Sequence, residues 1–264
     1  MRHVSDHLPA LRRSGHPKVT MSNALTRAAH GLSLPEMKLM ALAVSKMDSK
    51  SSAKVPDGYG GTKIKTLVSE LHAREYAEAF GVSESDGYKM LEKAALSLMK
   101  KHVTFYTEEH KRGGKKLVET IKRVQWVGSS EYIRQEGKIR IRWYDEIVPH
   151  LQDLRKHFTT YRLAQIKYLR HKSAVRLLAL LERFKSTGEA DYSVEDFCMS
   201  IEAAPSLRKD FGQLRRRIID PAVQELNLHS DWSIEYNARK TGKKVTHLHF
   251  TFQPNLQRSL DFGE

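Results

Sequence analysis

The same order of hydrophobic patterns occurs twice along this chain, and that order limits the possible folds more than any single motif. In each half, a helical pattern precedes two further helices joined by a short turn, and strand-like alternation follows. The segments "PEMKLMALAVSKM" and "KSAVRLLALLERF" begin the two copies, although their letters differ. Two copies of one small domain are the simplest organisation that fits this order.

In the first copy, the segment "SLPEMKLMALAVSKM" has the marks of a helix. Ser33 and Glu36 have capping-box spacing, and Pro35 falls in the first turn. Apolar residues gather on one face, namely Met37, Met40, Ala41 and Val44. The spacing therefore predicts an amphipathic helix.

The next segment, "HAREYAEAFGVSESDGYKMLEKAALSLMKK", predicts a helix-turn-helix, with a helix to Phe80, a turn at Gly81 and a longer helix after Ser83. The apolar face of the longer helix carries Tyr88, Leu91, Ala95 and Leu98. Its other face carries Ser85, Lys89, Lys93 and Lys100. The alternating stretch that follows has "KRGGKK" as a glycine turn, and helices followed by a basic hairpin are typical of a winged helix.

The second copy has its helix-turn-helix in "SVEDFCMSIEAAPSLRKDFGQLRRRIIDPAVQELN" and its hairpin in "DWSIEYNARKTGKKVTHLHFTF". On a helical wheel, the buried stripe of the last helix is Phe211, Leu214, Ile218, Ala222 and Leu226. The residues that lie opposite are Lys209, Gln213, Arg216, Arg217 and Asp220. Arg215 falls near the stripe, so the wheel gives it no clear position.

The predicted fold class is α+β, with two tandem winged-helix domains related by internal duplication. The strand pattern ends through Pro149 in "DEIVPHLQDLRKHFTT", which predicts the boundary between them. The expected parts are a flexible basic N-terminal arm (1–17), a first winged-helix domain (18–148), a linker (149–160), a second winged-helix domain (161–253) and a C-terminal tail (254–264).

The charge of the chain points to an anionic partner. Lys and Arg number 45 against 31 Asp and Glu, which gives a formal net charge of +14 and favours nucleic acid or a membrane surface. No apolar run approaches the roughly 18 residues of a membrane-spanning helix, and the first 17 residues lack the apolar core of a signal peptide. We therefore expect a cytoplasmic protein that binds nucleic acid and no membrane.

The basic residues of the two copies are the candidate DNA-binding residues. Arginine suits this role because its planar fork bonds to guanine O6 and N7, or to phosphate. In the second domain the candidates are Lys209, Gln213, Arg215, Arg216, Arg217, Arg239, Lys240, Lys243 and Lys244. In the first domain they are Ser83, Ser85, Lys89, Lys93, Lys111, Arg112, Lys115 and Lys116.

The sequence offers little for catalysis. "HLH" resembles the metal signature of rolling-circle nicking enzymes, with Tyr161 or Tyr168 as a possible nucleophile, but no nearby Asp or Glu is expected on the face shared by His247 and His249. Cys198 lies in an apolar stretch typical of a structural thiol. No phosphate-binding loop occurs, since "GYGGTKIKT" lacks the spacing. We therefore expect no enzyme activity, no metal and no cofactor.

Several segments together resemble one family. "NALTRAAHGLSLPEMKLMALAVSKMD", "AREYAEAFGVSESDGYKMLEKAALSLMKKHVTFY", "FTTYRLAQIKYL" and "FGQLRRRIIDPAVQELN…KTGKKVTHLHFTF" are similar to the tandem winged-helix initiators of iteron-containing plasmids. The resemblance runs in order from about Val19 to Gln253. Two departures from the family pattern are Gly87, where a larger apolar residue is usual, and the segment "EAAPSLRKDFG".

The resemblance implies a bacterial, plasmid-encoded initiator. Such a protein binds directly repeated origin sequences as a monomer and represses its own gene as a homodimer on an operator inverted repeat. It assigns dimerisation and backbone contacts to the first domain and sequence-specific binding to the second. It also implies a host initiator, the replicative helicase and chaperones as partners. A plain transcriptional repressor and a metal-dependent nicking enzyme remain as alternatives.

Overall fold

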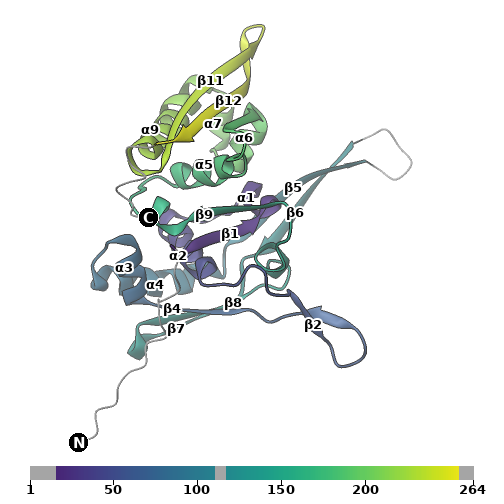
Figure 1. Ribbon diagram of the computed structural model, residues 1–264, viewed down its shortest axis with the longest axis vertical. Coiled ribbons are helices and arrows are strands. Elements are labelled where there is room, and N and C mark those ends of the chain that lie inside the picture. Colours follow the sequence, from purple (N-terminus) through teal and green to yellow (C-terminus); the bar gives the residue numbers. More distant parts are fainter. Residues whose placement is uncertain (1–15, 111–116, 256–264) are drawn as a thin grey trace, which may run out of the picture.

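The computed structural model describes residues 16–110 and 117–255 (Figure 1). The α-helices are α1 (Asn23–Arg27), α2 (Leu34–Ser45), α3 (Ala73–Phe80), α4 (Glu84–Leu98), α5 (Lys172–Glu182), α6 (Val194–Ser200), α7 (Pro205–Arg208), α8 (Phe211–Leu214) and α9 (Asp220–His229). The shorter or wider helical turns are η1 (Arg134–Glu136), η2 (Val148–His150), η3 (Leu163–Ile166) and the π-helical η4 (Arg215–Ile219).

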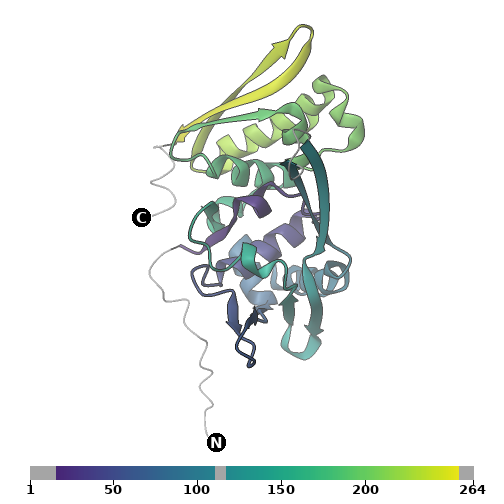
Figure 2. The same ribbon diagram turned by 90° about the vertical axis from the view of Figure 1, so that its right-hand side faces the viewer.

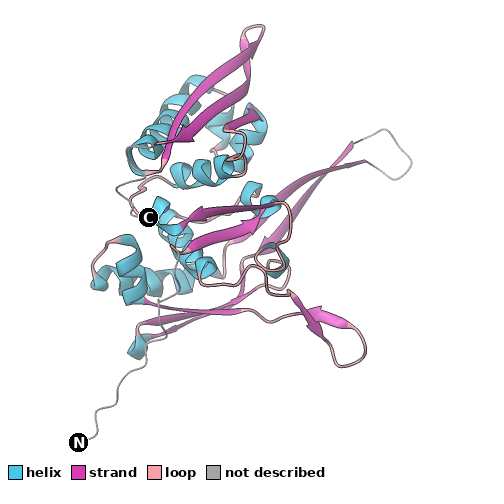
Figure 3. Cartoon of the chain, viewed as in Figure 1, coloured by secondary structure: helices cyan, strands magenta, loops and turns pink. Residues whose placement is uncertain are grey.

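The strands form small antiparallel sheets. They are β1 (Lys18–Ser22), β2 (Lys54–Pro56), β3 (Thr62–Ile64), β4 (Val68–His72), β5 (His102–His110), β6 (Leu117–Gln125), β7 (Val127–Ile133), β8 (Lys138–Trp143), β9 (Phe158–Arg162), β10 (Glu189–Ser193), β11 (Trp232–Thr241) and β12 (Lys244–Pro254). Three hairpins extend from the body of the molecule, namely β2–β3, β5–β6 and β11–β12 (Figure 3).

The two halves have the same topology, which confirms the predicted tandem winged-helix fold. In the first, α2 is followed by β4, the pair α3–α4 and the hairpin β7–β8, and the sheet order is β4-β8-β7. In the second, α5 is followed by β10, α6, the long helix α8–η4–α9 and the hairpin β11–β12, and the sheet order is β10-β12-β11. In both sheets the last strand pairs between the other two.

The predicted helix-turn-helix of the first domain is present. Gly81 ends α3 with φ at +64°, a left-handed conformation that glycine adopts without steric cost. The hydroxyl of Ser83 then accepts a bond from the N–H of Asp86 and caps α4. The capping box of α2 is also present, because Glu36 accepts from the N–H of Ser33 at 2.7 Å.

The α2 helix is buried on nearly every side, so the predicted single apolar face was too narrow. Leu39, Leu42 and Ala43 are buried together with the four residues expected. The reason is its position, because β1, α3, α4 and η3 all contact it. A helix surrounded in this way has no wide solvent face.

The hairpin that contains "KRGGKK" is not the wing of the first domain. β5 and β6 pair with each other as a separate two-stranded ribbon, whereas β7 and β8 complete the sheet after the helix-turn-helix. The wing, defined as the hairpin that joins the sheet beyond the recognition helix, is therefore β7–β8. The earlier hairpin is an insertion between α4 and that wing.

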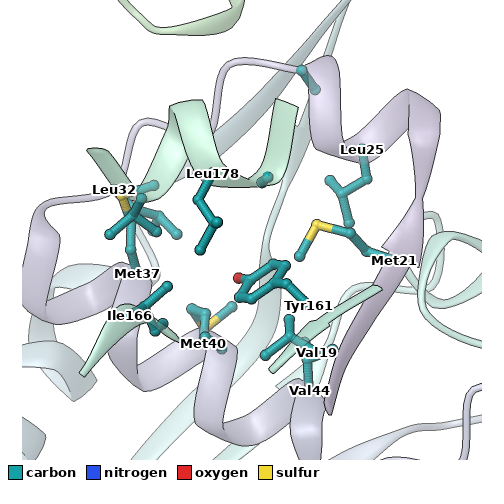
Figure 4. Close-up of a cluster of buried hydrophobic side chains, with 14 of the residues drawn as sticks. Val19, Met21, Leu25, Leu32, Met37, Met40, Val44, Tyr161, Ile166 and Leu178 are labelled. Carbon is teal, nitrogen blue, oxygen red and sulfur yellow. The ribbon is translucent and has the colours of Figure 1, made fainter. Parts of the chain in front are cut away.

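The core is continuous between the two halves. Residues near the N-terminus pair with residues far along the chain, since β1 pairs antiparallel with β9. Figure 4 shows Tyr161 of β9, Ile166 of η3 and Leu178 of α5 packed with Met40 of α2 and other buried apolar residues. α5 is the helix of the second domain that faces the first (Figure 1), and it is buried over almost its whole length.

The bounds proposed for the domains stay a prediction. Within the expected linker, Leu151, Leu154 and Thr159 are buried, and η2 and the start of β9 are ordered elements. Most of the expected arm (1–15) and tail (256–264) lie outside the described residues. The shared core means that residues from Tyr161 to Glu182 contribute to the packing of both domains.

Candidate nucleic-acid interface

The long helix of the second domain, α8–η4–α9, is its recognition helix in the winged-helix topology. The carboxylate of Asp210 accepts from the N–H of Gln213 at 3.0 Å and caps its start. Pro221 lies inside this helix and has no N–H for the carbonyl of Arg217, four residues earlier, with which its ring would also clash. The wider η4 turn immediately before the proline relieves that conflict.

The wider turn changes which side chain is buried. The wheel placed Ile218 in the apolar stripe, but Ile219 is fully buried and Ile218 only partly. In a π-turn the residue five positions after Leu214 lies beneath it, so Ile219 takes the place that a regular helix would give to Ile218. The same change turns Arg215 to the surface, where its Nε lies 3.2 Å from Asp220 Oδ2.

The three successive arginines are therefore all exposed. Arg216 donates to the side-chain oxygen of Gln213 at 3.1 Å, and Lys209 is exposed at the end of α7. Among the described residues, no acidic side chain forms an ion pair with Arg216 or Arg217. These candidates lie on the outer side of the helix, while Leu214, Ile219, Ala222 and Leu226 hold its inner side in the core.

The wing of the second domain carries the remaining candidates. β11 and β12 pair up to Thr241 and Lys244, and Gly242 takes φ +62° in the turn between them. Lys240, Lys243 and Lys244 are exposed and form no ion pair within the described part of the chain. Arg239 differs, because it pairs with Asp191 of β10 at 2.8 Å. Figure 2 shows this long hairpin above the recognition helix.

In the first domain, α4 is the recognition helix and exposes Ser85, Lys89 and Lys93. Ser83 is occupied as the helix cap, since its hydroxyl also donates to Asp86 at 2.7 Å. Lys89 lies 3.9 Å from Asp86. The candidates Lys111, Arg112, Lys115 and Lys116 lie outside the described residues.

The wing of the first domain was not among the sequence candidates, and its charges are largely paired. Arg134 at its tip bonds to Glu92 of α4. Lys138 bonds to Glu136, and both Lys138 and Arg140 contact Glu70. The alternation in "GKIRIRW" indicated the strand β8, but it did not indicate that β8 pairs with β4 and β7. The two wings thus differ, with free cations on the second and internal ion pairs on the first.

The neighbourhood of His247 and His249 corrects one expectation from the sequence. Asp191 of β10 pairs directly opposite His249 and therefore shares its face, with Oδ2 at 3.5 Å from the imidazole Nδ1. Asp191 also binds Arg239, which makes it part of an ion-pair network. Among the described residues, no group of three or more His, Cys, Asp and Glu is arranged to hold a metal ion.

The tyrosines considered as nucleophiles lie away from these histidines. Tyr161 is buried, and burial raises the pKa of its hydroxyl. Tyr168 packs near His229, at the end of the sheet where β12 reaches Pro254. His247 lies seven residues before Pro254 along β12, so these two positions of the strand are roughly 20 Å apart.

Cys198 is buried in α6, and burial raises the pKa of its thiol to about 11. Such a thiol is protonated at neutral pH and unreactive. Its position agrees with the structural role expected from the sequence.

Two winged helices in one chain, each presenting an exposed recognition helix that carries basic residues, define the class of tandem winged-helix DNA-binding proteins. The chain belongs to the replication initiator family. The family model described as "Initiator Replication protein, WH1" matches residues 18–182, and the model "Initiator Rep protein, WH2" matches residues 193–252. The resemblance found in the sequence is thereby confirmed.

Known proteins with similar sequence or fold agree with this membership. The chain is 25% identical over 233 residues to an "Uncharacterized 27.6 kDa protein" of Escherichia coli, covering 86% of this chain and 91% of that protein. It is 23% identical over 248 residues to a "Replication initiation protein" of Escherichia coli, covering 92% of this chain and 71% of that protein. The Pi initiator protein, solved in complex with iteron DNA, has the same fold, with a TM-score of 0.69 and 18% identity over 90% of this chain and 97% of that one.

No helix in the described ranges combines the length and the apolar character that crossing a membrane requires.

Proposed function

We propose that this protein initiates plasmid replication by binding directly repeated origin sequences as a monomer, and that as a dimer it represses its own gene at an inverted repeat. The observation that carries the proposal is the repeated winged-helix topology, which gives one chain two recognition helices. Two such helices reach successive major-groove faces about one helical turn apart, so a monomer spans roughly 20 bp. A partner chain is then unnecessary on a direct repeat.

The DNA contacts are assigned by charge and exposure. Arg216 and Arg217 are the proposed base-reading residues of the second domain, with Lys209, Gln213 and Arg215 beside them. In the wing, the exposed Lys240, Lys243 and Lys244 are proposed to bind phosphates, together with Arg239. In the first domain, Ser85, Lys89 and Lys93 of α4 are proposed to contact the backbone, as are the basic residues of the "KRGGKK" turn.

The dimer needs a different arrangement. A dimer with two-fold symmetry requires an inverted repeat, so one arrangement of the DNA-binding surfaces does not fit both the direct repeat and the inverted repeat. The proposed contact is in the first domain, where the outer edges of the β5–β6 ribbon pair with no other strand of the described residues, apart from a bridge between Ala29 and Thr104. Host initiator, helicase and chaperones are proposed as further partners in the bacterial cytoplasm.

The test is a measurement of stoichiometry on two DNAs. Light scattering of complexes should find a monomer on one direct repeat and a dimer on the palindrome. Binding of a dimer with equal affinity to one direct repeat would contradict the proposed switch. A footprint limited to a lone palindrome beside the gene would favour a plain repressor instead.

A further inference from the structure

Arg215 differs from the two arginines that follow it, because its guanidinium has an anionic partner within the protein. Its Nε donates to Oδ2 of Asp220 at 3.2 Å. Arg216 bonds to the neutral side chain of Gln213, and Arg217 bonds to no side chain among the described residues. All three arginines are exposed on the same helix. The contact with Asp220, and not exposure, therefore sets Arg215 apart.

The π-helical turn η4 makes this contact possible. The N–H of Asp220 donates to the carbonyl of Arg215, five residues earlier. In a regular helix, positions five apart point about 140° away from each other, because one turn takes 3.6 residues. The wider turn brings positions 215 and 220 onto one side of the helix. The turn that accommodates Pro221 therefore also places an acid beside Arg215.

Asp220 is itself held from the neighbouring sheet. Its Oδ1 accepts a hydrogen bond from the hydroxyl of Tyr236 in β11. The ring of Tyr236 is partly buried, and its centroid lies 5.7 Å from that of the fully buried Phe250. Burial, and then the bond to Asp220, raise the pKa of this hydroxyl to about 12, so it keeps its proton and donates at neutral pH. A chain of contacts thus runs from the core to the guanidinium of Arg215.

The contact with Asp220 leaves the end of the Arg215 side chain available to a ligand. A guanidinium has five N–H donors, and Nε supplies one of them. The two Nη groups still form the fork that bonds to guanine O6 and N7. The side chain is 62% exposed, so this fork is open to a partner from solvent. Because the side chain is already held, less conformational entropy is lost when it binds.

The nearby carboxylate favours a base over a phosphate as the partner of Arg215. Asp220 already offsets the charge of this guanidinium, and it would repel an approaching phosphate. The edge of a guanine is uncharged and matches the planar fork. Arg216 and Arg217 have no acidic partner among the described residues, so their charge is not offset in this way.

We propose that Arg215 reads a guanine of the origin repeat in a fixed orientation, and that Asp220 and Tyr236 position it for this contact. Arg215 is then a specificity-determining residue beside Arg216 and Arg217. Asp220 and Tyr236 act through Arg215 and need no DNA contact of their own. This inference rests on the proposed sequence-specific binding of origin DNA by the second domain.

The test uses the full chain and duplexes that carry one direct repeat, which a footprint of the DNA flanking the gene defines first. Each duplex replaces one guanine of the repeat with 7-deazaguanine, which lacks the N7 acceptor. The variants are Arg215→Ala, Asp220→Asn and Tyr236→Phe, the last of which keeps the ring and removes the hydroxyl. The matched control is Glu235→Gln, which removes one negative charge from an exposed residue on the other face of β11.

Wild type and Glu235→Gln should each bind about fivefold or more weakly when one particular guanine is modified, because a charge-assisted hydrogen bond is lost there. Arg215→Ala should respond to that modification by less than about twofold and keep the wild-type response at the other guanines. Asp220→Asn and Tyr236→Phe should respond at the same guanine by less than about threefold. A wild-type profile in Arg215→Ala, or an undiminished response in either positioning variant, would overturn the inference.

The control separates positioning from charge. Removing a negative charge near DNA strengthens binding to any sequence, so Asp220→Asn and Glu235→Gln should both bind random DNA slightly more tightly. The ratio of cognate to random affinity should fall in Asp220→Asn alone. An equal ratio in these two proteins would overturn the positioning role. Equal affinity of wild type for cognate and random DNA would instead contradict the proposed function.

A measurement on the free wild-type chain needs no variant and no DNA. NMR relaxation at the side-chain Nε–H groups compares Arg215 with Arg217. The order parameter of Arg217 should be below about 0.6, as in flexible groups, and that of Arg215 should lie well above it. Equal, low order parameters in both arginines would overturn the inference, whatever the variants do.

Discussion

The guanidinium of Arg176 lies against the imidazole of His30, with Nη1 at 3.1 Å from Nδ1 and 2.9 Å from Nε2. Both side chains are buried at the domain boundary. His30 Nε2 is also 2.8 Å from the carbonyl of Leu25, and Arg176 donates to the carbonyls of Ala28 and Ser200. A neutral imidazole satisfies this geometry, because Nε2–H then donates to Leu25 and the bare Nδ1 accepts from Arg176.

This contact predicts a loss of stability in mild acid. Burial, and then the cation of Arg176, hold the pKa of His30 well below its usual range, and Lys172 acts in the same direction. Below the ordinary histidine pKa of about 6.5, the unfolded chain therefore takes up a proton that the folded chain does not. Stability from this group should fall by about 1.4 kcal/mol per pH unit as the pH drops below that value, until the pH reaches the folded pKa.

Urea unfolding at several pH values checks this expectation. The free energy of unfolding of His30→Gln should depend less on pH than that of wild type between about pH 7 and about pH 5.5. The variant is expected to be less stable at neutral pH, because its side chain does not reproduce both hydrogen bonds. Equal slopes for the two proteins would contradict the role assigned to His30.

Replacing Arg216 and Arg217 with alanine should remove specific DNA binding and leave the fold intact. Both side chains are exposed and the helix is held by Leu214 and Ile219 on its other side. Each arginine that reads a base should contribute ~1–3 kcal/mol, or about ten- to a hundredfold in affinity. Titration of the cognate site, with circular dichroism as a folding control, measures the loss. Unchanged affinity would rule out this helix as the reading element.

Neutralising Lys240, Lys243 and Lys244 should weaken binding to cognate and random DNA alike. These side chains lie on a hairpin and have no ion pair among the described residues, so they are free to bind phosphates. The slope of log K against log salt should become shallower by roughly one unit for each phosphate that the variant no longer binds. If the substitutions weaken binding to the cognate site alone, the wing contacts bases rather than phosphates.

Much of the fold followed from local patterns in the sequence. The capping box at Ser33, the turn at Gly81 and the cap at Ser83 depend on neighbouring residues, and all three are present. The duplicated order of elements was also visible, because each copy carries its own periodicity. Local rules therefore predicted the two domains and their recognition helices.

The errors concern contacts between distant segments and one irregular turn. β8 pairs with β4, whose short sequence "VSELH" has no clear alternation, so the wing of the first domain was assigned to the wrong hairpin. Asp191 lies 58 positions before His249, and no local pattern places it on the same face. A 3.6-residue wheel does not describe η4, and so it placed Ile218 where Ile219 lies.

Gly87 departs from the family pattern, and the structure gives a reason for glycine there. A Cβ added at this position would lie 2.6 Å from the backbone oxygen of Ala73 and 3.5 Å from the Cβ of Ala77. α3 and α4 therefore approach each other closely at Gly87, and backbone atoms have little freedom to move away.

The change Gly87→Ala should consequently destabilise the first domain. Overpacking costs about 1–3 kcal/mol, while alanine recovers about 1 kcal/mol of helix propensity, so the expected net loss of stability is up to about 2 kcal/mol. Gly212→Ala is the control. A Cβ added at Gly212 would lie 3.3 Å from Oδ1 of Asp210, which is the far end of a side chain rather than backbone, so this change should be neutral or stabilising. Thermal unfolding compares the two, and an equal or higher midpoint for Gly87→Ala than for wild type would show that α3 moves aside without cost.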